Sequence, residues 1–239
     1  MRIRRMRNYT GRRASPLMGG ASVAQPPALL ANLLAYWTLN ESSGNRADST
    51  GNGKTMVETG SVTGAAGFGN VGAVSVWPNN VANYLSLGSV LFSSGSWSIA
   101  GWLNLAAVGV AQQVFSQAQA GVGNRQFISV ATTGRVNYSA SGSNAQGTTV
   151  LTSGTWYLLV STYDGTTIKG YVNAAASADA SATQTASYTG DVIYLGRASG
   201  AAPLNGSLGG WGVYNKVLSN TEQVWLYNAG NGRAFNEFV

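Results

Sequence analysis

The sequence predicts an all-β fold, a two-sheet antiparallel sandwich. From Leu34 onward, short segments that alternate apolar and polar residues recur at regular spacing, with turn residues between them. Of the 239 residues, 32 are glycine and 9% are charged, against about 25% charged residues in an ordinary soluble domain. Val, Ile, Thr, Tyr and Trp are plentiful, and runs with helical spacing are scarce. These observations predict many short strands joined by tight turns.

The chain begins with a basic arm. Residues 1–13 contain no acid and six arginines: Arg2, Arg4, Arg5, Arg7, Arg12 and Arg13. The remaining eight basic residues equal the eight acidic residues in number, so the formal net charge of +6 belongs to the arm. This asymmetry argues against a nucleic-acid-binding surface on the body and favours an arm that seeks an acidic partner.

Four roles fit the arm: a solvated tail, a nucleic-acid tail, a targeting peptide, or a segment that docks onto a partner protein. Aromatic residues are few, with only Tyr9, and no apolar stretch follows the charges as in an export signal. An arm without a core of its own becomes ordered only when something holds it. We therefore expect residues 1–27, which end at Pro26-Pro27, to be an extended arm and linker that docks onto other proteins in a large assembly.

The stretch from Leu34 to Gly53 begins as a strand and becomes a polar loop. Ala35, Trp37 and Leu39 alternate with polar or amphipathic residues, and the loop from Asn40 to Gly53 is rich in Gly, Asn and hydroxyl residues around Asp48. Such a loop is either a ligand site or a turn whose side chains bond its own backbone. The sequence favours the second, with Asp48 as the central acceptor.

The other predicted strands follow in order, with one helix at the end. The most apolar segment, 156–163, is expected in the middle of a sheet, and Asp164-Gly165 turns it into a hairpin. Residues 174–187, mostly Ala, Ser and Thr, predict an exposed edge or long loop. Ser219 to Ala229 predicts a helix with a capping box of Ser219 and Glu222, ended by Gly230. The predicted strands are 55–58, 73–76, 84–87, 97–105, 113–117, 127–131, 135–139, 156–163, 168–172, 192–195 and 207–214.

Five segments in order resemble the concanavalin A-like superfamily, in particular its laminin-G-like (LamG, pentraxin-related) branch. They are LLAYWTLNESSGNRADSTGNG, WSIAGWLNL, GTWYLLVSTYDGTTIKGYVN, IYLGR and NGSLGGWGVYNKVLSNTEQVWLYNAG. The resemblance implies a jelly-roll sandwich over residues 28–239, with one short C-terminal helix and with the first and last strands paired. It also implies a module that binds glycans, proteins or lipids, in some members with calcium. Similar domains occur in bacteriophage structural proteins.

The sequence departs from this family at the candidate metal site. Family members often carry two acidic residues where this chain has Gly209 and Gly210. Only Asp48 and Asn52 remain as candidate calcium ligands, whereas calcium takes six to eight oxygen ligands. We expect no cofactor.

Nothing in the sequence indicates catalysis. With no histidine and no cysteine, a Ser/His/Asp or Cys/His triad is impossible. Glycosidases place two carboxylates together, but no two acidic residues here lie within four positions of each other. The sequence therefore predicts a non-enzymatic protein.

One segment, WPNNVANY, combines aromatic and amide side chains in the way that sugar binding requires. The candidate glycan contacts are Trp77, Asn79, Asn80, Asn83 and Tyr84. The alternative, which we favour for Trp77, is that it completes a strand and packs in the core, as most tryptophans do. Likewise Trp211 and Trp225 are expected to pack the last strand against the helix.

The hypothesis that combines these expectations is a virion structural protein, a capsid decoration or tail component, that displays a lectin-like domain in many copies. The alternative is a carbohydrate-binding module or adhesin for cell-surface glycans. The longest apolar run, 28–37, is interrupted by Asn32 and is shorter than the about 20 residues of a transmembrane helix. We therefore expect no membrane partner. The virion hypothesis itself implies a virion location.

Overall fold

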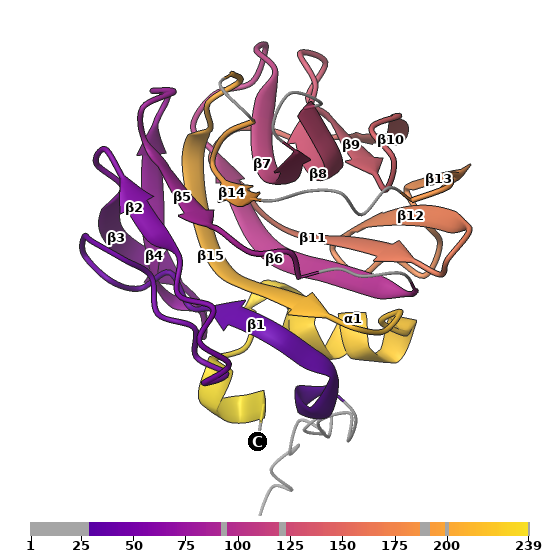
Figure 1. The fold of residues 1–239 in the computed structure, drawn as a ribbon, viewed down its shortest axis with the longest axis horizontal. Helices are drawn as coiled ribbons and strands as arrows, with labels where there is room; N and C mark the ends of the chain where they lie inside the picture. The colour runs from indigo at the N-terminus through magenta and orange to yellow at the C-terminus, as the bar shows by residue number, and fades with distance from the viewer. Residues whose placement is uncertain (1–28, 92–94, 120–122, 187–191, 199–200, 239) are drawn as a thin grey trace, which may run out of the picture.

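A computed structural model describes residues 29–91, 95–119, 123–186, 192–198 and 201–238. These residues form two antiparallel sheets that lie face to face, which confirms the predicted sandwich (Figure 1). The basic arm lies outside the described residues, so its extended structure and its role stay predictions. In the part of the chain that is described, no helix is long and apolar enough to cross a membrane.

The first sheet has eight strands. They are β1 (Leu33–Trp37), β3 (Thr63–Phe68), β4 (Gly72–Pro78), β6 (Trp97–Leu105), β11 (Trp156–Tyr163), β12 (Thr167–Val172), β13 (Ala180–Thr183) and β15 (Asn205–Tyr214). Their order is β13-β12-β11-β6-β15-β4-β3, and β1 pairs with β15. The implied pairing of the first and last strands is thus confirmed, with Trp37 opposite Trp211.

The second sheet has seven strands. They are β2 (Val57–Thr59), β5 (Tyr84–Leu87), β7 (Gln112–Gln119), β8 (Gly123–Val130), β9 (Arg135–Ser139), β10 (Ala145–Val150) and β14 (Val192–Leu195). Their order is β10-β9-β8-β7-β14-β5-β2. Strand β14 comes late in the chain but lies between β7 and β5, so it brings residues near 194 beside residues near 84.

The main core lies between the two sheets and follows the period-2 pattern of the strands. On β6, Trp97, Ile99 and Leu103 point into this core, and Trp102 points to the opposite face, where it is also buried. Both faces of β6 are therefore covered. A Cβ at Gly101 would lie 2.2 Å from the ring of Trp211, so only glycine lets this ring cross β6.

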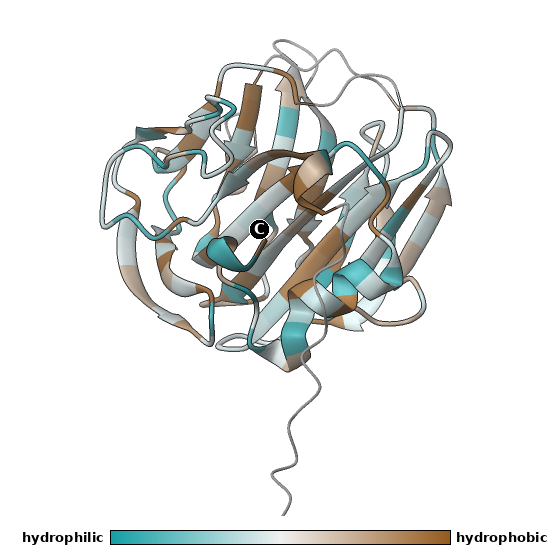
Figure 2. Ribbon diagram, turned by 90° about the horizontal axis from the view of Figure 1, so that it is seen from below, coloured by the Kyte–Doolittle hydropathy of each residue, from teal (hydrophilic) through white to brown (hydrophobic). Residues whose placement is uncertain are grey.

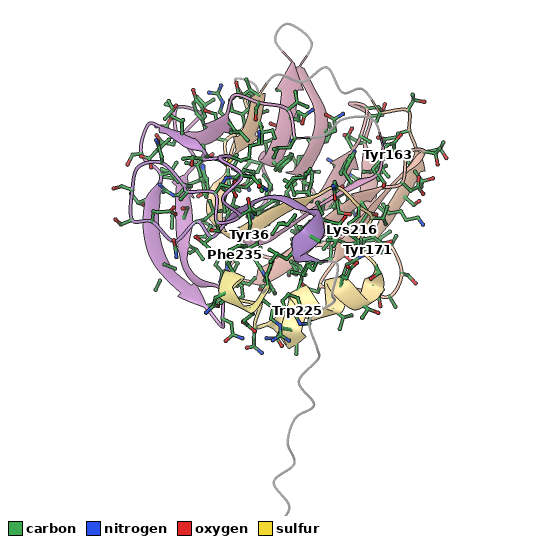
Figure 3. All side chains as sticks on the ribbon, turned by 60° about the horizontal axis from the view of Figure 1, so that its bottom comes forward. Tyr36, Tyr163, Tyr171, Lys216, Trp225 and Phe235 are labelled. Atoms are coloured by element: carbon green, nitrogen blue, oxygen red, sulfur yellow. The ribbon has the colours of Figure 1, made fainter. Side chains whose placement is uncertain are left out.

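A second cluster covers the outer face of the eight-stranded sheet. Helix α1 (Asn220–Tyr227) and the 3-10 helix η3 (Phe235–Phe238) lie across its strands in the view from below (Figure 2). Tyr36 of β1 stacks on Phe235 with ring centroids 5.0 Å apart, and Trp225 of α1 lies close by (Figure 3). One outer face of the sandwich is thus closed by the C-terminal segment.

The helix begins where the sequence predicted but ends earlier than predicted. Ser219 and Glu222 form the capping box. Asn228 takes the left-handed conformation at φ 46°, so α1 ends before Gly230. Trp225 packs under the sheet as expected. For Trp211 the prediction is wrong, because its side chain points into the core between the sheets, away from α1.

The sequence missed three strands and placed others correctly. Strands β3 and β10 were not predicted, and β13 forms within the Ala/Ser/Thr segment 174–187. That segment was expected at an exposed edge, and β13 does end the order of its sheet. Strand β11 lies inside the sheet between β12 and β6, as predicted. The Asp164-Gly165 hairpin is also present, with Tyr163 opposite Ile168.

Candidate functional site

The first residue of the WPNNVANY segment, Trp77, packs in the core. Trp77 is 1% exposed and lies in the core between the sheets, where Gly196 leaves room for its ring. Its ring therefore has no exposed face for a sugar. Trp77 is not a glycan contact, and it packs in the core as the alternative interpretation had it.

The asparagines of this segment shape a turn. Asn79 adopts φ 55°, and the side chain of Asn80 accepts a hydrogen bond from the Ala82 amide at 2.9 Å. Asn83 is 7% exposed, and its Oδ1 accepts from the Ser61 amide at 2.9 Å. The prediction of Asn83 as an exposed glycan contact is therefore wrong: its side chain is buried and links two loops. Asn79 and Asn80 remain exposed beside the start of β5.

Tyr84 lies in a three-residue surface cluster that the sequence did not reveal. Its ring packs edge-on against Tyr194 of β14 with centroids 5.6 Å apart. The guanidinium of Arg197 lies over both rings, 3.8 Å from the centroid of Tyr84 and 4.8 Å from that of Tyr194. Arg197 Nη1 donates to the carbonyl of Val81 at 3.3 Å, so the turn, β5 and β14 are fixed together.

Tyr194 also belongs to a row of side chains on the outer face of the seven-stranded sheet. Neighbouring positions on successive strands carry Val57, Ser86, Tyr194, Ser116, Phe127 and Ser139. Residues next to them in sequence, such as Ile193 and Phe115, point into the core, so the row faces outward. We call these six side chains the aromatic–hydroxyl row.

The aromatic–hydroxyl row is open at one end and more buried toward β9. Val57 is 51% exposed and Tyr194 and Ser86 are partly exposed, whereas Phe127 is 9% exposed and Ser116 and Ser139 are fully buried. The Oγ of Ser116 donates to the carbonyl of Arg197 at 3.2 Å, which ties the cluster to the row. Aromatic faces beside hydroxyl donors and acceptors are the surfaces that pyranose and furanose rings contact. In the described part of the chain, no helix covers this face (Figure 1).

The Asn40–Gly53 loop is held by Asp48, as expected. Its Oδ1 accepts hydrogen bonds from the amides of Tyr36 and Thr50 and from the Thr50 hydroxyl. Its Oδ2 accepts from the amide of Lys54 at 3.0 Å. Burial raises the pKa of Asp48, but these hydrogen bonds outweigh burial and hold the pKa below its usual value.

These contacts do not fit a calcium ion. Both oxygens of Asp48 face N–H and O–H donors, and the Asn52 amide donates to the carbonyl of Leu34 at 3.1 Å. Among the described residues, no three Asp, Glu, His or Cys residues gather as metal ligands. A Cβ at Gly210 would lie 2.6 Å from the Tyr36 hydroxyl, so a family-type aspartate has no room there.

Arg46 is the buried residue that sequence reasoning missed in this loop. Its side chain is fully buried and donates to Ser75 Oγ at 2.9 Å, to the carbonyl of Val62 at 2.6 Å and to the carbonyl of Gly44. Its Nη1 pairs with Glu58 at 3.1 Å. The loop is therefore fastened to the sandwich and is a structural element.

A hollow beside this loop lacks the chemistry of a sugar site. It has a volume of about 400 Å³ and is lined by Leu34, Asn52, Lys54, Val90 and Leu91. None of these described lining residues is aromatic. The aromatic–hydroxyl row and the Arg197 cluster are thus the better candidate.

Two sheets packed face to face, one of them with partly exposed tyrosine and serine side chains on the outer face of β5 and β14, define a lectin-like β-sandwich. The chain belongs to the concanavalin A-like lectin/glucanases superfamily, whose laminin-G-type family model matches residues 79–222. No curated protein sequence matches the chain.

Solved structures show the same fold. Domain 4 of AbnA, an extracellular arabinanase from Geobacillus stearothermophilus in complex with arabinotriose, matches with a TM-score of 0.65 and 20% identity, over 81% of this chain and 97% of that domain. The binding domain of Paraclostridial Mosquitocidal Protein 1 matches with a TM-score of 0.69 and 12% identity, over 84% of this chain and 53% of that one. A Trypanosoma rangeli sialidase matches with a TM-score of 0.64 and 12% identity, over 84% of this chain.

The extent of these matches differs. The chain spans nearly the whole arabinanase domain but about half of the toxin binding domain and 33% of the sialidase chain. At such identities the likeness shows the fold alone. Several of the similar structures are binding domains, and some are parts of glycosidases.

Proposed function

We propose that the chain is a non-catalytic carbohydrate-binding module whose site is the open outer face of the seven-stranded sheet. The observation that carries this proposal is the aromatic–hydroxyl row together with the adjacent Tyr84–Arg197–Tyr194 cluster. On the opposite outer face α1 and η3 cover part of the sheet, and the partly exposed rings of Phe68 and Trp156 stack on each other with centroids 4.3 Å apart. The arabinotriose complex of the similar arabinanase domain supports an oligosaccharide as the ligand class.

No pair of carboxylates in the described chain is arranged for glycoside hydrolysis. The two that approach the same group, Glu41 and Glu58, both pair with the buried Arg46. This arrangement supports a binding function over a catalytic one.

Replacing Tyr194 with alanine tests the proposed site. We expect Tyr194→Ala to weaken binding of the best glycan by about tenfold, because a ring that stacks on a sugar is removed. A glycan array that includes arabino-oligosaccharides would identify the ligand, and calorimetric titration would give the affinity. Tyr171→Ala, a partly exposed tyrosine on β12 of the other sheet, is the matched control. Equal loss in both variants, or no glycan bound by the full chain, would contradict the proposal.

We also propose that residues 1–27 attach this domain to a virion. The supporting observation is the charge asymmetry, with six arginines in residues 1–13 and equal numbers of acidic and basic residues in the rest. A basic arm joined to a weakly charged domain favours docking onto an acidic surface of a larger assembly.

Deleting residues 1–27 should abolish association with the assembled particles and leave the thermal transition of the domain unchanged. Co-sedimentation with particles measures association, and circular dichroism measures folding. A variant with all six arginines changed to lysine keeps the charge and should retain part of the binding. If the shortened chain loads onto particles as well as the full chain, the arm is not the attachment segment.

A further inference from the structure

The Tyr84–Arg197–Tyr194 cluster bears on the class of sugar that the module binds. We propose that the module binds an acidic oligosaccharide and that the guanidinium of Arg197 binds its carboxylate or sulfate group. This inference rests on the proposed function, because it concerns the same surface. It adds the charge of the ligand, which neither the fold nor the family determines.

Arg197 is held rigidly while most of its hydrogen-bonding capacity is unused. The ring of Tyr84 lies 3.8 Å from its Cζ, and that of Tyr194 lies 4.8 Å away. A guanidinium has five N–H donors, and within the described residues the side chain of Arg197 donates to one acceptor, the carbonyl of Val81 at 3.3 Å. Its Nε is buried without an acceptor, so the ligand-accessible donors are those on the terminal nitrogens.

Among the described residues, no carboxylate pairs with Arg197. The ion pairs among the described residues involve Arg46, Lys216 and Arg233, each with a glutamate, and none involves Arg197. Aromatic faces attract a cation, but they do not use its in-plane N–H donors. A partly buried cation whose in-plane donors are free binds a carboxylate or sulfate through short charge-assisted hydrogen bonds.

Arg197 lies next to the proposed sugar-binding surface. Tyr194 lies under the guanidinium and also belongs to the aromatic–hydroxyl row, next to Ser86 and Ser116. A sugar ring on Tyr194 would therefore place its acidic substituent beside Arg197. Because the two rings already fix the side chain, little conformational entropy is lost when the anion binds.

Paired neutral and acidic probes test this inference. Calorimetric titration of the full chain would compare lactose with 3′-sialyllactose, and oligogalacturonate with its fully methyl-esterified form. We expect each acidic probe that binds to bind at least about tenfold more tightly than its neutral counterpart. We expect this preference to shrink as the salt concentration rises, because mobile ions screen the attraction.

Two substitutions and one control locate the effect. Arg197→Gln should remove the acidic preference, and Arg197→Lys should recover only part of it, because an ammonium cannot bind in the planar bidentate geometry. Arg135→Gln removes the same charge from an exposed position on β9, three strands from β14 or about 14 Å away, and should keep the preference. Thermal melting of each variant confirms that it is folded.

The outcomes separate this inference from the proposed function. If neutral and acidic probes bind equally well, or if Arg197→Gln weakens both equally, the acidic class is wrong and the carbohydrate module stands. If neither these probes nor any array glycan binds, the proposed function and the inference fail together. Tighter binding of acidic probes that depends on Arg197 and not on Arg135 establishes the inference.

Discussion

Replacing Arg46 with methionine should lower the free energy of unfolding by about 3–5 kcal/mol, the cost of removing one partner of a buried ion pair. The side chain of Arg46 is fully buried, and it joins the polar loop to β4 and to the segment before β3. Without it, Glu58, whose side chain is 13% exposed, loses its cation at 3.1 Å. The Ser75 hydroxyl and the Val62 carbonyl lose a donor at the same time.

Urea unfolding followed by tryptophan fluorescence measures this loss. Arg135→Met is the matched control, because it makes the same change at an exposed position and should alter stability little. Arg46→Lys should remain strongly destabilised, since a lysine ammonium cannot reach acceptors in so many directions. A loss below about 1 kcal/mol in Arg46→Met would mean that the loop does not depend on this residue.

Replacing Asp48 with alanine should lower the free energy of unfolding by about 2–3 kcal/mol, because three backbone amides and one hydroxyl lose a charged acceptor. These groups belong to Tyr36, Thr50 and Lys54, so the carboxylate ties β1 to both ends of the turn. The Asp48→Ala variant should bind glycans as the unchanged chain does, since the loop lies outside the aromatic–hydroxyl row. Unchanged thermal stability would return the loop to consideration as a ligand site.

The pH dependence of stability gives a second measurement for Asp48. Its pKa in the folded chain lies below the ordinary value of 3.8, so its contribution is present above that value. The contribution is lost as the pH falls through the lower, folded pKa. Stability of the unchanged chain should therefore drop in acid more steeply than that of Asp48→Asn. Hydrogen bonds from the amides of Thr167 and Thr166 also lower the pKa of Asp164, so Asp164→Ala should flatten the acid dependence in the same direction.

Local patterns predicted much of the fold because they reflect local chemistry. The alternating pattern of 97–105 predicted a strand, and β6 spans Trp97–Leu105. Ser219 and Glu222 predicted the helix start through a capping box that involves only neighbouring residues. Where side chains are small and similar, as in 174–187, no pattern separates strand from loop, and this segment was predicted only as an exposed edge or a long loop.

The candidate site was less predictable. Tyr84 was among the predicted contacts, but Trp77 and Asn83 proved to be buried. Tyr194 and Arg197 carry no sequence signal of a site, because a tyrosine and an arginine are ordinary residues in any strand and turn. Arg46 looked like one more polar residue of a loop, and only its burial shows that it is structural.

The sequence by itself determined that this chain forms an antiparallel sandwich with a capped C-terminal helix, because alternation and capping act between residues that are close in the chain. It also determined that the net positive charge belongs to residues 1–13, since the rest of the chain has equal numbers of basic and acidic residues. The tertiary structure decided which outer face is open and which aromatic residues meet there. Strand β14 pairs beside β5, so Arg197 contacts a turn 116 positions away in sequence. Such a meeting depends on the order of strands in the sheet, which residue spacing does not encode.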